Sequence, residues 1–419
     1  MIIETSSPTS RVPTVGVVVH RTGRLRSLGD PLLFVLDDLV RRWDRQGHPV
    51  VFAVVDSGST PEGAVAAVEV LADREDVGVV VTLAGSHTVP AVARTCARRG
   101  VPCVSTMLPW QVYRRQSELG ADEGRVFHFA WGLDDIAWAF GEMWRAAGVA
   151  EVGCLWNDDV QGRALRSAEG GFVSTAQASG FGLVDLEAYR ESESDFVEQV
   201  EALVASGMRA VTSAGTPQDL ARFWGAARAE EVRLRLLTSS RWLTYPFGAA
   251  QAGVDGVATV VSWSPRGATR SSLGVGGAEE LARTYEEVTG RPWLQPLGLA
   301  HALVEVAVHA VTAAADPRDR GVVAEVLAGA CVETVAGRLD WTRGPAPGVA
   351  RCRWRVGSGG VGVRGGSWCW WPTALGRMCR WRVSCAFWTE SSCESSRLGL
   401  LGWVFSAGRG LSPVGQGRR

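Results

Sequence analysis

The sequence contains no lysine: all 43 of its basic residues are arginine, and Asn157 is its only asparagine. The lack of lysine excludes P-loop NTPases, protein kinases and Schiff-base enzymes, because each of these classes depends on a lysine amine. Residues 1–350 also lack the Gly-x-Ser-x-Gly, His-Glu-x-x-His, Gly-x-Gly-x-x-Gly and Cys-x-x-Cys motifs. The sequence therefore gives no indication of an enzyme and calls for no cofactor or metal.

Export and membrane signals are absent from the sequence as well. No apolar run approaches the roughly 18 to 20 residues that a membrane span needs. Residues 1–13 have no basic segment followed by an apolar stretch, so no signal peptide is readable. Residues 1–350 carry 32 Arg against 42 Asp plus Glu, and this acidic balance argues against nucleic acid as a partner.

Apolar runs alternate with amphipathic helical patterns in two successive units. The first unit predicts strands at 14–19, 49–55, 77–83 and 101–105, with helices at 30–46, 61–73 and 88–99 between them. The same rhythm restarts with a strand at 151–156 and a helix at 163–179, and later helices at 278–289, 297–315 and 319–329 precede a last strand at 334–341. This alternation is typical of parallel sheets covered on both faces by helices. A chain of 419 residues is long enough for two such domains.

Several stretches, taken in order, carry a family resemblance: Val15–Gly23 with Gly29, Ala84–Ser86 with Val101–Ser105, Phe127–Phe129 with Asp134 and Asp135, Asn157–Asp159 with Gly162, Asp195 with Phe196, and Gly337–Asp340. Pro109 with Trp110, Phe129–Leu133 and Trp263–Pro265 indicate a narrower subgroup. Together these stretches resemble the type I periplasmic-binding-protein fold, in its leucine/isoleucine/valine-binding branch. The resemblance spans about residues 13–350.

The resemblance implies an α/β fold of two Rossmann-like lobes, each a parallel sheet flanked by helices, joined by three hinge crossovers. These crossovers are expected near Phe129–Leu133, Ser262–Pro265 and Ala336–Asp340. The first lobe would then contain residues 13–130 and 264–335. The second lobe, left incomplete, would contain residues 131–263 and 336–350.

The implied function is that of a solute-binding receptor. It would capture a small polar organic ligand, such as an amino acid or amide, and deliver it to an ABC importer. The partners would be the ligand and the importer permease, and membrane contact would come only through that permease or a lipid anchor. The implied location is extracytoplasmic, in the periplasm or as a cell-surface lipoprotein. The alternatives are a cytosolic small-molecule sensor on the same fold and, third, an α/β enzyme.

Ligands of such sheets bind beyond the carboxyl ends of the strands. In the resembled family, an Ala-Thr pair after the fourth strand holds the carboxylate of α-amino acids, whereas Leu108 and Pro109 stand here. This departure puts an amino-acid ligand in question. The candidate ligand-binding residues are Ser86, His87, Thr88, Thr106 and Trp110 in the first lobe, with Asn157, Asp158, Thr216, Arg241, Trp242 and Trp263 in the second lobe or hinge.

Each of these candidates also has a structural interpretation. Ser86 can simply cap the following helix, and each tryptophan can belong to a core. Cys96 and Cys103 flank a helix end and a strand start, so they are either a disulfide or two buried thiols. His301, Glu305 and His309 share one helix face, and this spacing could bind a metal, but the apolar residues on the same helix favour a boundary position.

The composition changes abruptly after residue 350. Residues 351–419 hold 11 Arg against 2 Glu, five of the nine cysteines and seven of the 18 tryptophans. When Cys352–Gly360 is written in GC-favoured codons and read from the third base, it gives Pro-Leu-Ala-Gly-Gly-Gln-Trp-Arg, which resembles how the family continues. We therefore expect residues 351–419 to be an out-of-frame, poorly ordered tail created by a frameshift near Arg351, rather than a Trp/Arg-rich binding surface.

Overall fold

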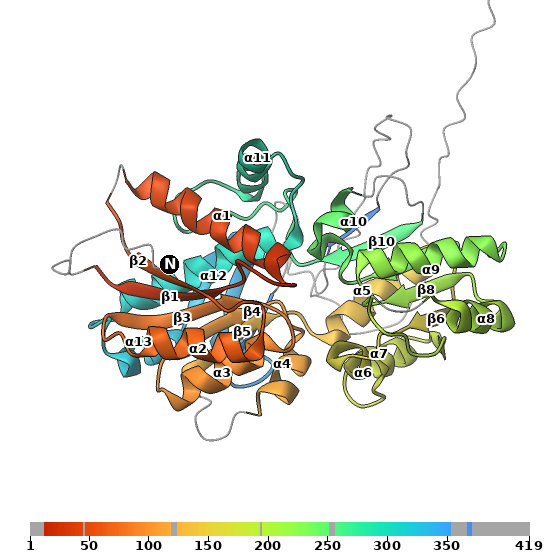
Figure 1. Ribbon diagram of the computed structural model, residues 1–419, viewed down its shortest axis with the longest axis horizontal. Helices are drawn as coiled ribbons and strands as arrows, with labels where there is room; N and C mark the ends of the chain where they lie inside the picture. Colours follow the sequence, from red (N-terminus) through yellow and green to blue (C-terminus); the bar gives the residue numbers. More distant parts are fainter. Residues whose placement is uncertain are drawn as a thin grey trace, which may run out of the picture.

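The computed structural model describes residues 12–44, 47–118, 124–192, 195–250, 256–352 and 367–370. Within them the chain forms two α/β lobes that lie side by side, each built on one six-stranded sheet (Figure 1). The prediction of two lobes with parallel sheets flanked by helices is confirmed.

The first lobe is built on a sheet whose strands are all parallel, in the order β13-β5-β4-β3-β1-β2. Its strands are β1 Thr14–Val19, β2 Val51–Asp56, β3 Val77–Leu83, β4 Cys103–Thr106, β5 Val126–Ala130 and β13 Val349–Arg351. The central strands are valine-rich and buried on both faces, as expected when helices cover both sides of a parallel sheet.

Alternate residues of β1 serve two different cores because successive side chains of a strand point to opposite faces. Val15, Val17 and Val19 join one core with α1, α11, α12 and α13, whereas Val18 joins the other with α2, α3 and α4. Figure 1 shows α12 and α2 on opposite sides of the sheet. These helices are α1 Arg26–Trp43, α2 Pro61–Ala72, α3 Thr88–Arg98, α4 Trp110–Ser117, α11 Ala278–Thr289, α12 Gln295–Ala313 and α13 Arg320–Ala328.

Local sequence signals account for several helix ends. Thr60 accepts a hydrogen bond from the Gly63 N–H, and Pro61 stands at the first turn, so α2 begins where the sequence predicts.

Helix α12 is the one helix among the described residues that is long and apolar enough to cross a membrane, and 83% of its apolar window is buried inside the protein. That burial is typical of a core helix.

The second lobe repeats the plan with strand order β14-β10-β9-β8-β6-β7, in which only β14 is antiparallel to its neighbour. Its strands are β6 Glu151–Leu155, β7 Gly182–Asp185, β8 Ala210–Ser213, β9 Leu236–Ser239, β10 Val257–Val261 and β14 Ser367–Trp370. Helices α5 Leu133–Ala146, α6 Val160–Arg166 and α7 Phe172–Ala178 cover one face. Helices α8 Val197–Ser206 and α9 Pro217–Ala229, with η2 Trp242–Thr244 and α10 Pro246–Ala250, cover the other.

Two described links connect the lobes, one between β5 and α5 and one after β10 at Ser262–Pro265. The sequence places a third crossover at Ala336–Asp340 and residues 336–350 in the second lobe, but the structure differs. Residues 331–340 form a hairpin of β11 Cys331–Thr334 and β12 Gly337–Asp340, and β13 then pairs with β5 of the first sheet. Gly337 has a φ of 99°, so the chain reverses there instead of crossing.

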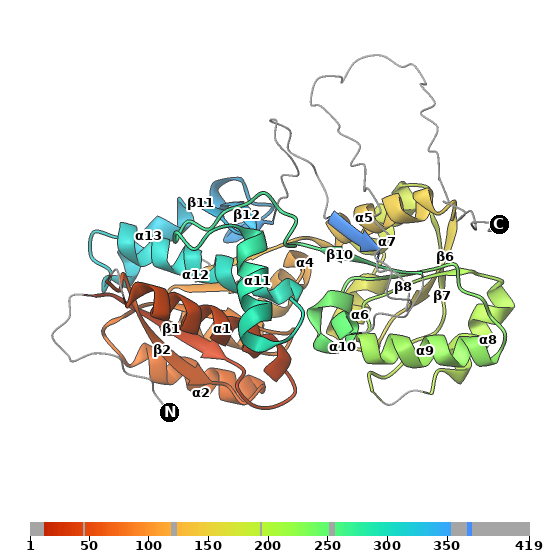
Figure 2. The same ribbon diagram turned by 90° about the horizontal axis from the view of Figure 1, so that it is seen from above.

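A segment after β12 anchors the C-terminal part of the first lobe. Trp341, in η3 Trp341–Arg343, packs edge-on against Phe127 and Phe129 of β5. β13 belongs to the first sheet and β14 to the second. The prediction for the tail lies outside the described residues, apart from the backbone of β14. Figure 2 shows β14 beside β10, with α10 at the side of the second lobe that faces the first.

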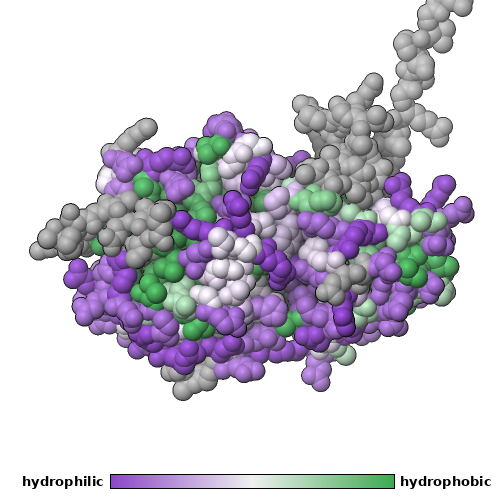
Figure 3. Space-filling model, viewed as in Figure 1, coloured by the Kyte–Doolittle hydropathy of each residue, from purple (hydrophilic) through white to green (hydrophobic). Residues whose placement is uncertain are grey.

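The outer surface of both lobes is mainly hydrophilic in the view of Figure 3, with small apolar patches between charged residues. The exposed large apolar side chains among the described residues are scattered. Trp138 of α5, which is 42% exposed, is the largest of these side chains by size. Isolated apolar residues of this kind are ordinary on protein surfaces.

Candidate functional site

A cleft of about 400 Å³ lies between the two lobes. The loops that line it follow the carboxyl ends of β1, β3, β4 and β5 in the first lobe and of β6, β7 and β9 in the second. Open α/β sheets bind ligands at this edge. The lining residues are Arg24, Leu25, Leu28, Ala84, Gly85, Ser86, His87, Met107, Leu108, Pro109, Trp131, Ile136, Asp159, Gln161, Glu191, Ser192, Ser240, Arg241, Thr244, Tyr245 and Gln295.

Arg241 is the principal charge of the second-lobe wall. It follows β9, and its guanidinium donates hydrogen bonds to the Ala214 carbonyl at 3.0 Å and the Tyr245 hydroxyl at 2.9 Å. Burial alone would lower the pKa of Arg241, but Tyr245, Glu191 and Asp159 outweigh it and raise that pKa above its usual value. The cleft therefore holds a permanent, largely buried positive charge.

Glu191 connects the two walls. One carboxylate oxygen lies 3.1 Å from Arg24 Nη1 of the first lobe, and the other lies 3.6 Å from Arg241 Nη1. Asn157 Nδ2 donates to the second oxygen at 3.4 Å. The Arg24–Glu191 pair spans the cleft, so separation of the lobes would break it while the Glu191–Arg241 contact would stay within the second lobe.

Ser86, His87 and Arg241 are the predicted site residues that line the cleft. Leu108 and Pro109, which replace the Ala-Thr pair of the resembled family, line it too. Two of these five positions thus present apolar side chains, and one of them, Pro109, stands where the resembled family has the threonine hydroxyl.

The other polar candidates do not line the cleft, because each side chain serves the local structure. Thr106 Oγ1 donates to the Phe129 carbonyl, and Thr88 Oγ1 to the Gly85 carbonyl. Thr216 caps α9 through the Asp219 N–H. Asp158 is exposed and pairs with Arg163, whereas Asn157 lies behind the cleft and supports Glu191.

The tryptophan candidates pack into cores or the hinge. Trp242 is buried in the second lobe, and the ring of Trp263 lies against α12 at Gly298, where a Cβ atom would come within 2.1 Å of it. Trp110 lies under the guanidinium of Arg351, 5.8 Å from its ring centroid. Arg351 also pairs with Asp134 and Asp135 at the start of α5, so this cluster joins the lobes at the hinge.

Sequence reasoning missed Arg24, Asp159, Glu191, Ser240 and Tyr245. All five lie in loops or short turns, where no periodic pattern marks the direction of a side chain. Their one readable signal is position, since Asp159 and Ser240 come within four residues of a strand's carboxyl end. Glu191 comes six residues after β7, and nothing in its surroundings distinguishes it from an ordinary surface carboxylate.

Cys96 and Cys103 are two free, buried thiols and do not form a disulfide. Burial raises the pKa of Cys96 well above its ordinary value, which keeps the thiol protonated.

Glu305 of α12 accepts hydrogen bonds from the Ser272 and Val335 N–H groups and lies 3.3 Å from His301. Among the described residues, no group of three or more His, Cys, Asp or Glu is placed to hold a metal ion.

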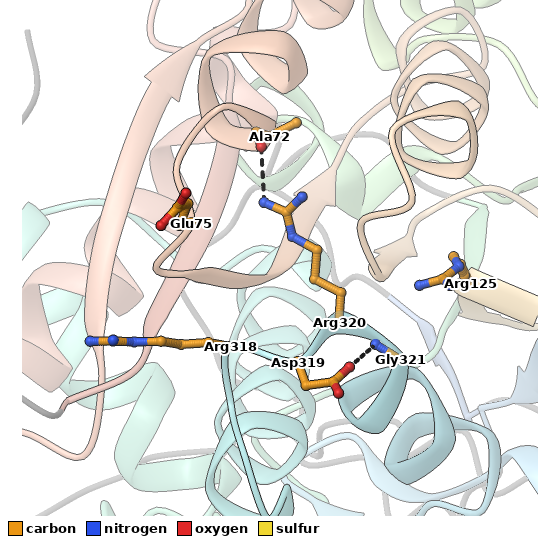
Figure 4. Close-up of a pocket in the computed structure, with 7 residues that line it drawn as sticks. All are labelled: Ala72, Glu75, Arg125, Arg318, Asp319, Arg320 and Gly321. Atoms are coloured by element: carbon orange, nitrogen blue, oxygen red, sulfur yellow. Dashed lines mark hydrogen bonds between the residues drawn. The ribbon is translucent and has the colours of Figure 1, made fainter.

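A second hollow, of about 450 Å³, lies at the opposite edge of the first sheet, near the amino ends of β3 and β5. Arg320 already donates to the carbonyls of Ala72, Arg74 and Val77, and Asp319 caps α13. The lining side chains point in different directions and do not converge (Figure 4). This hollow therefore resembles a structural junction more than a binding site.

Two lobes joined by short links, with a cleft between the carboxyl edges of their sheets, define a two-lobed α/β binding protein. Residues 13–355 match the periplasmic binding protein family, so the chain belongs to that family. A search among curated proteins finds no match.

Solved structures of binding proteins share the fold. The leucine-binding protein LivK from Thermotoga maritima is 17% identical, with a TM-score of 0.64 over 78% of this chain and 91% of its own. LivJ from Streptococcus pneumoniae, solved with isoleucine, is 15% identical, with a TM-score of 0.63 over 82% and 94%. An ABC-transporter solute-binding protein from R. palustris, solved with benzoate, is 16% identical, with a TM-score of 0.63 over 85% and 96%.

Proposed function

We propose that this protein is a solute-binding receptor that captures a small organic ligand between its lobes and delivers it to an ABC importer. The observation that carries the proposal is the cleft itself: loops from both sheets line it, and the Arg24–Glu191 pair crosses it. A ligand that contacts both walls would stabilise the closed arrangement, since it interacts more strongly with that state.

Delivery to an importer and a location outside the cytoplasm are the finer parts of this proposal. They are supported by membership of the periplasmic binding protein family and by similar structures described as the binding proteins of transporters, an ABC transporter in one case. The ligand class is supported in the same way, because those neighbours were solved with isoleucine and with benzoate. We propose a ligand of comparable size, held by the polar groups of the second lobe together with Ser86 and His87.

A thermal-shift screen of amino acids, amides, polyamines and small carboxylic acids would test the proposal. A solute that binds only the folded protein raises its apparent stability by mass action, by about 2.7 kcal/mol at 100 times its Kd. We expect one chemical class to raise the Tm by several degrees, with no chemical change in the solute. Absence of any shift, together with turnover of one compound, would contradict the receptor function.

A further inference from the structure

The two walls of the cleft differ in polarity after the first-lobe strand β4. Met107, Leu108 and Pro109 present apolar side chains there, and proline has no N–H to donate. The Leu108 carbonyl already accepts a hydrogen bond from His128 Nε2 at 2.9 Å. This part of the first-lobe wall therefore offers a surface for an apolar body and no side-chain group for an anion.

The second-lobe wall offers hydrogen-bond donors. Ser240 lines the cleft, is 8% exposed, and its Oγ has no hydrogen-bond partner among the described residues. A buried polar group without a partner is costly, so a group that a ligand can satisfy is expected at such a position. Beside it, the Arg241 guanidinium uses two hydrogen bonds to Ala214 and Tyr245, out of the five N–H donors that it carries.

Glu191 only partly balances the charge of Arg241. Its nearer contact is with Arg24, at 3.1 Å, whereas Arg241 lies at 3.6 Å, beyond hydrogen-bond distance. Arg241 therefore keeps donor capacity toward the cleft, next to the unpartnered hydroxyl of Ser240. Because two arginines already flank Glu191, this carboxylate is poorly placed to hold a ligand ammonium group. The other carboxylate of the lining, Asp159, accepts the Gly162 N–H as the cap of α6.

We propose that the ligand is a small monocarboxylate with an apolar body and no α-amino group. Its carboxylate accepts hydrogen bonds from Arg241 and Ser240 of the second lobe, and its body lies against Met107–Pro109 of the first. The proposal rests on the receptor function above and specifies its ligand. It makes Arg241 and Ser240 the specificity-determining residues. It also places the anion on the second lobe, opposite Leu108 and Pro109 of the first.

Two matched series of probes test the ligand class by calorimetric titration of the full chain. One series is 4-methylpentanoate, 4-methylpentanamide and leucine, and the other is 3-phenylpropanoate, 3-phenylpropanamide and phenylalanine. In at least one series, we expect the carboxylate to bind about tenfold or more tightly than the amide, and more tightly than the amino acid. Tighter binding of the amide or the amino acid in both series would overturn the proposal.

The outcomes also separate this proposal from the receptor function. If neither carboxylate binds while a solute of another class does, the ligand class is wrong and the receptor function stands. If no solute of any class binds, both fail.

Substitutions test the two residues. Arg241→Gln should weaken the carboxylate about 30-fold or more and leave the amide nearly unchanged, because the lost contact is charge-assisted. Ser240→Ala, which removes only a hydroxyl and so should preserve folding, should weaken the carboxylate about threefold to tenfold. Arg318→Gln, at the second hollow, is the matched control and should change neither.

A different pattern of losses would overturn the assignment of the anion site. If Ser86→Ala abolishes the preference for the carboxylate and the Arg241 and Ser240 variants keep it, the anion lies at the start of α3. Thermal unfolding of each variant without ligand shows whether a loss of binding reflects a loss of fold.

Discussion

The first lobe carries all six histidines of the chain, whereas the second lobe carries none, and its wall of the cleft holds the largely buried charge of Arg241. His128 illustrates the consequence. Its Nε2 donates to the Leu108 carbonyl, so its Nδ1 accepts from the Ser105 hydroxyl, and the ring stacks on Tyr113 at 4.1 Å. A neutral histidine thus holds the apolar wall of the cleft, and a charged arginine forms the polar wall. The two lobes share a plan but should respond differently to pH, packing changes and salt.

Acid should weaken the first lobe most, and this is the largest effect that we expect. Burial lowers the pKa of His20, against the charge of Asp56, and the pKa of His128, each to about 4 from 6.5. Between those values the unfolded chain binds more protons, so stability falls as the pH drops through this window. At pH 5 the loss is about 2 kcal/mol for each histidine, measurable by urea unfolding.

Hydrogen exchange at pH 7 and pH 5 would locate this loss. We expect protection to fall in the first lobe first, and His128→Gln to flatten the pH dependence. Earlier loss of protection in the second lobe would contradict the expectation that the first lobe is the more acid-sensitive of the two.

The next largest effect concerns the packing of the link into the first lobe. A Cβ atom at Gly298 would lie about 2.1 Å from the Trp263 ring, so Gly298→Ala should cost about 1–3 kcal/mol of unfolding free energy. The matched control is Gly225→Ala in α9 of the second lobe, where a Cβ atom would meet nothing within 4 Å. That change should be neutral or slightly stabilising. Equal effects in urea unfolding would show that the Trp263 contact is unimportant.

An effect of intermediate size is expected on ligand affinity when the apolar wall of the cleft is made polar at Met107. Met107→Glu places a charge against the proposed apolar body of the ligand and removes apolar contact, so binding of the tighter carboxylate probe should weaken about tenfold or more. Met107→Leu preserves the apolar surface and should change the Kd far less. Calorimetric titration checks both. Unchanged binding by the Glu variant would mean that the ligand body lies elsewhere.

The smallest effect should come from the pair that crosses the cleft. Arg24 is 66% exposed at its side chain, so its contact with Glu191 is worth about 1 kcal/mol or less and is screened by salt. Arg24→Gln should shift the ligand-free protein slightly toward the open arrangement in small-angle scattering, most visibly at low salt. Arg26→Gln, at a side chain that is 68% exposed and paired with Asp30 of its own helix, is the control. A larger shift in the control would show that the Arg24–Glu191 contact does not hold the two lobes together.

Residue patterns predicted the regular elements well because hydrophobic periodicity and capping act locally. Strands β1 and β3 and helix α11 have the predicted bounds. The expected helix at 163–179 is instead two helices, α6 and α7, because Gly170 adopts a φ of 54° between them. The hairpin at 331–340 was missed for a related reason, since a turn at Val335–Gly337 depends on one glycine rather than on a periodic pattern.

The candidate site was less predictable, because strand-end position selects a loop but not the direction of its side chains. Ser86 and Arg241 line the cleft, whereas Thr106 turns its hydroxyl to the Phe129 carbonyl and Trp242 turns into a core. The frameshift near Arg351 stays a prediction. Resequencing the gene tests it, and coding character in the present frame across 351–419 would contradict it.

Hydrogen exchange with and without the tightest-binding solute of the screen tests the central claim most directly. If the cleft is the binding site and the lobes close on the ligand, protection should rise on both walls, at residues 84–87 and 107–109 of the first lobe and at 239–245 of the second. It should stay unchanged around the hollow at Arg318–Gly321. Protection confined to one lobe, or appearing at that hollow, would contradict the account.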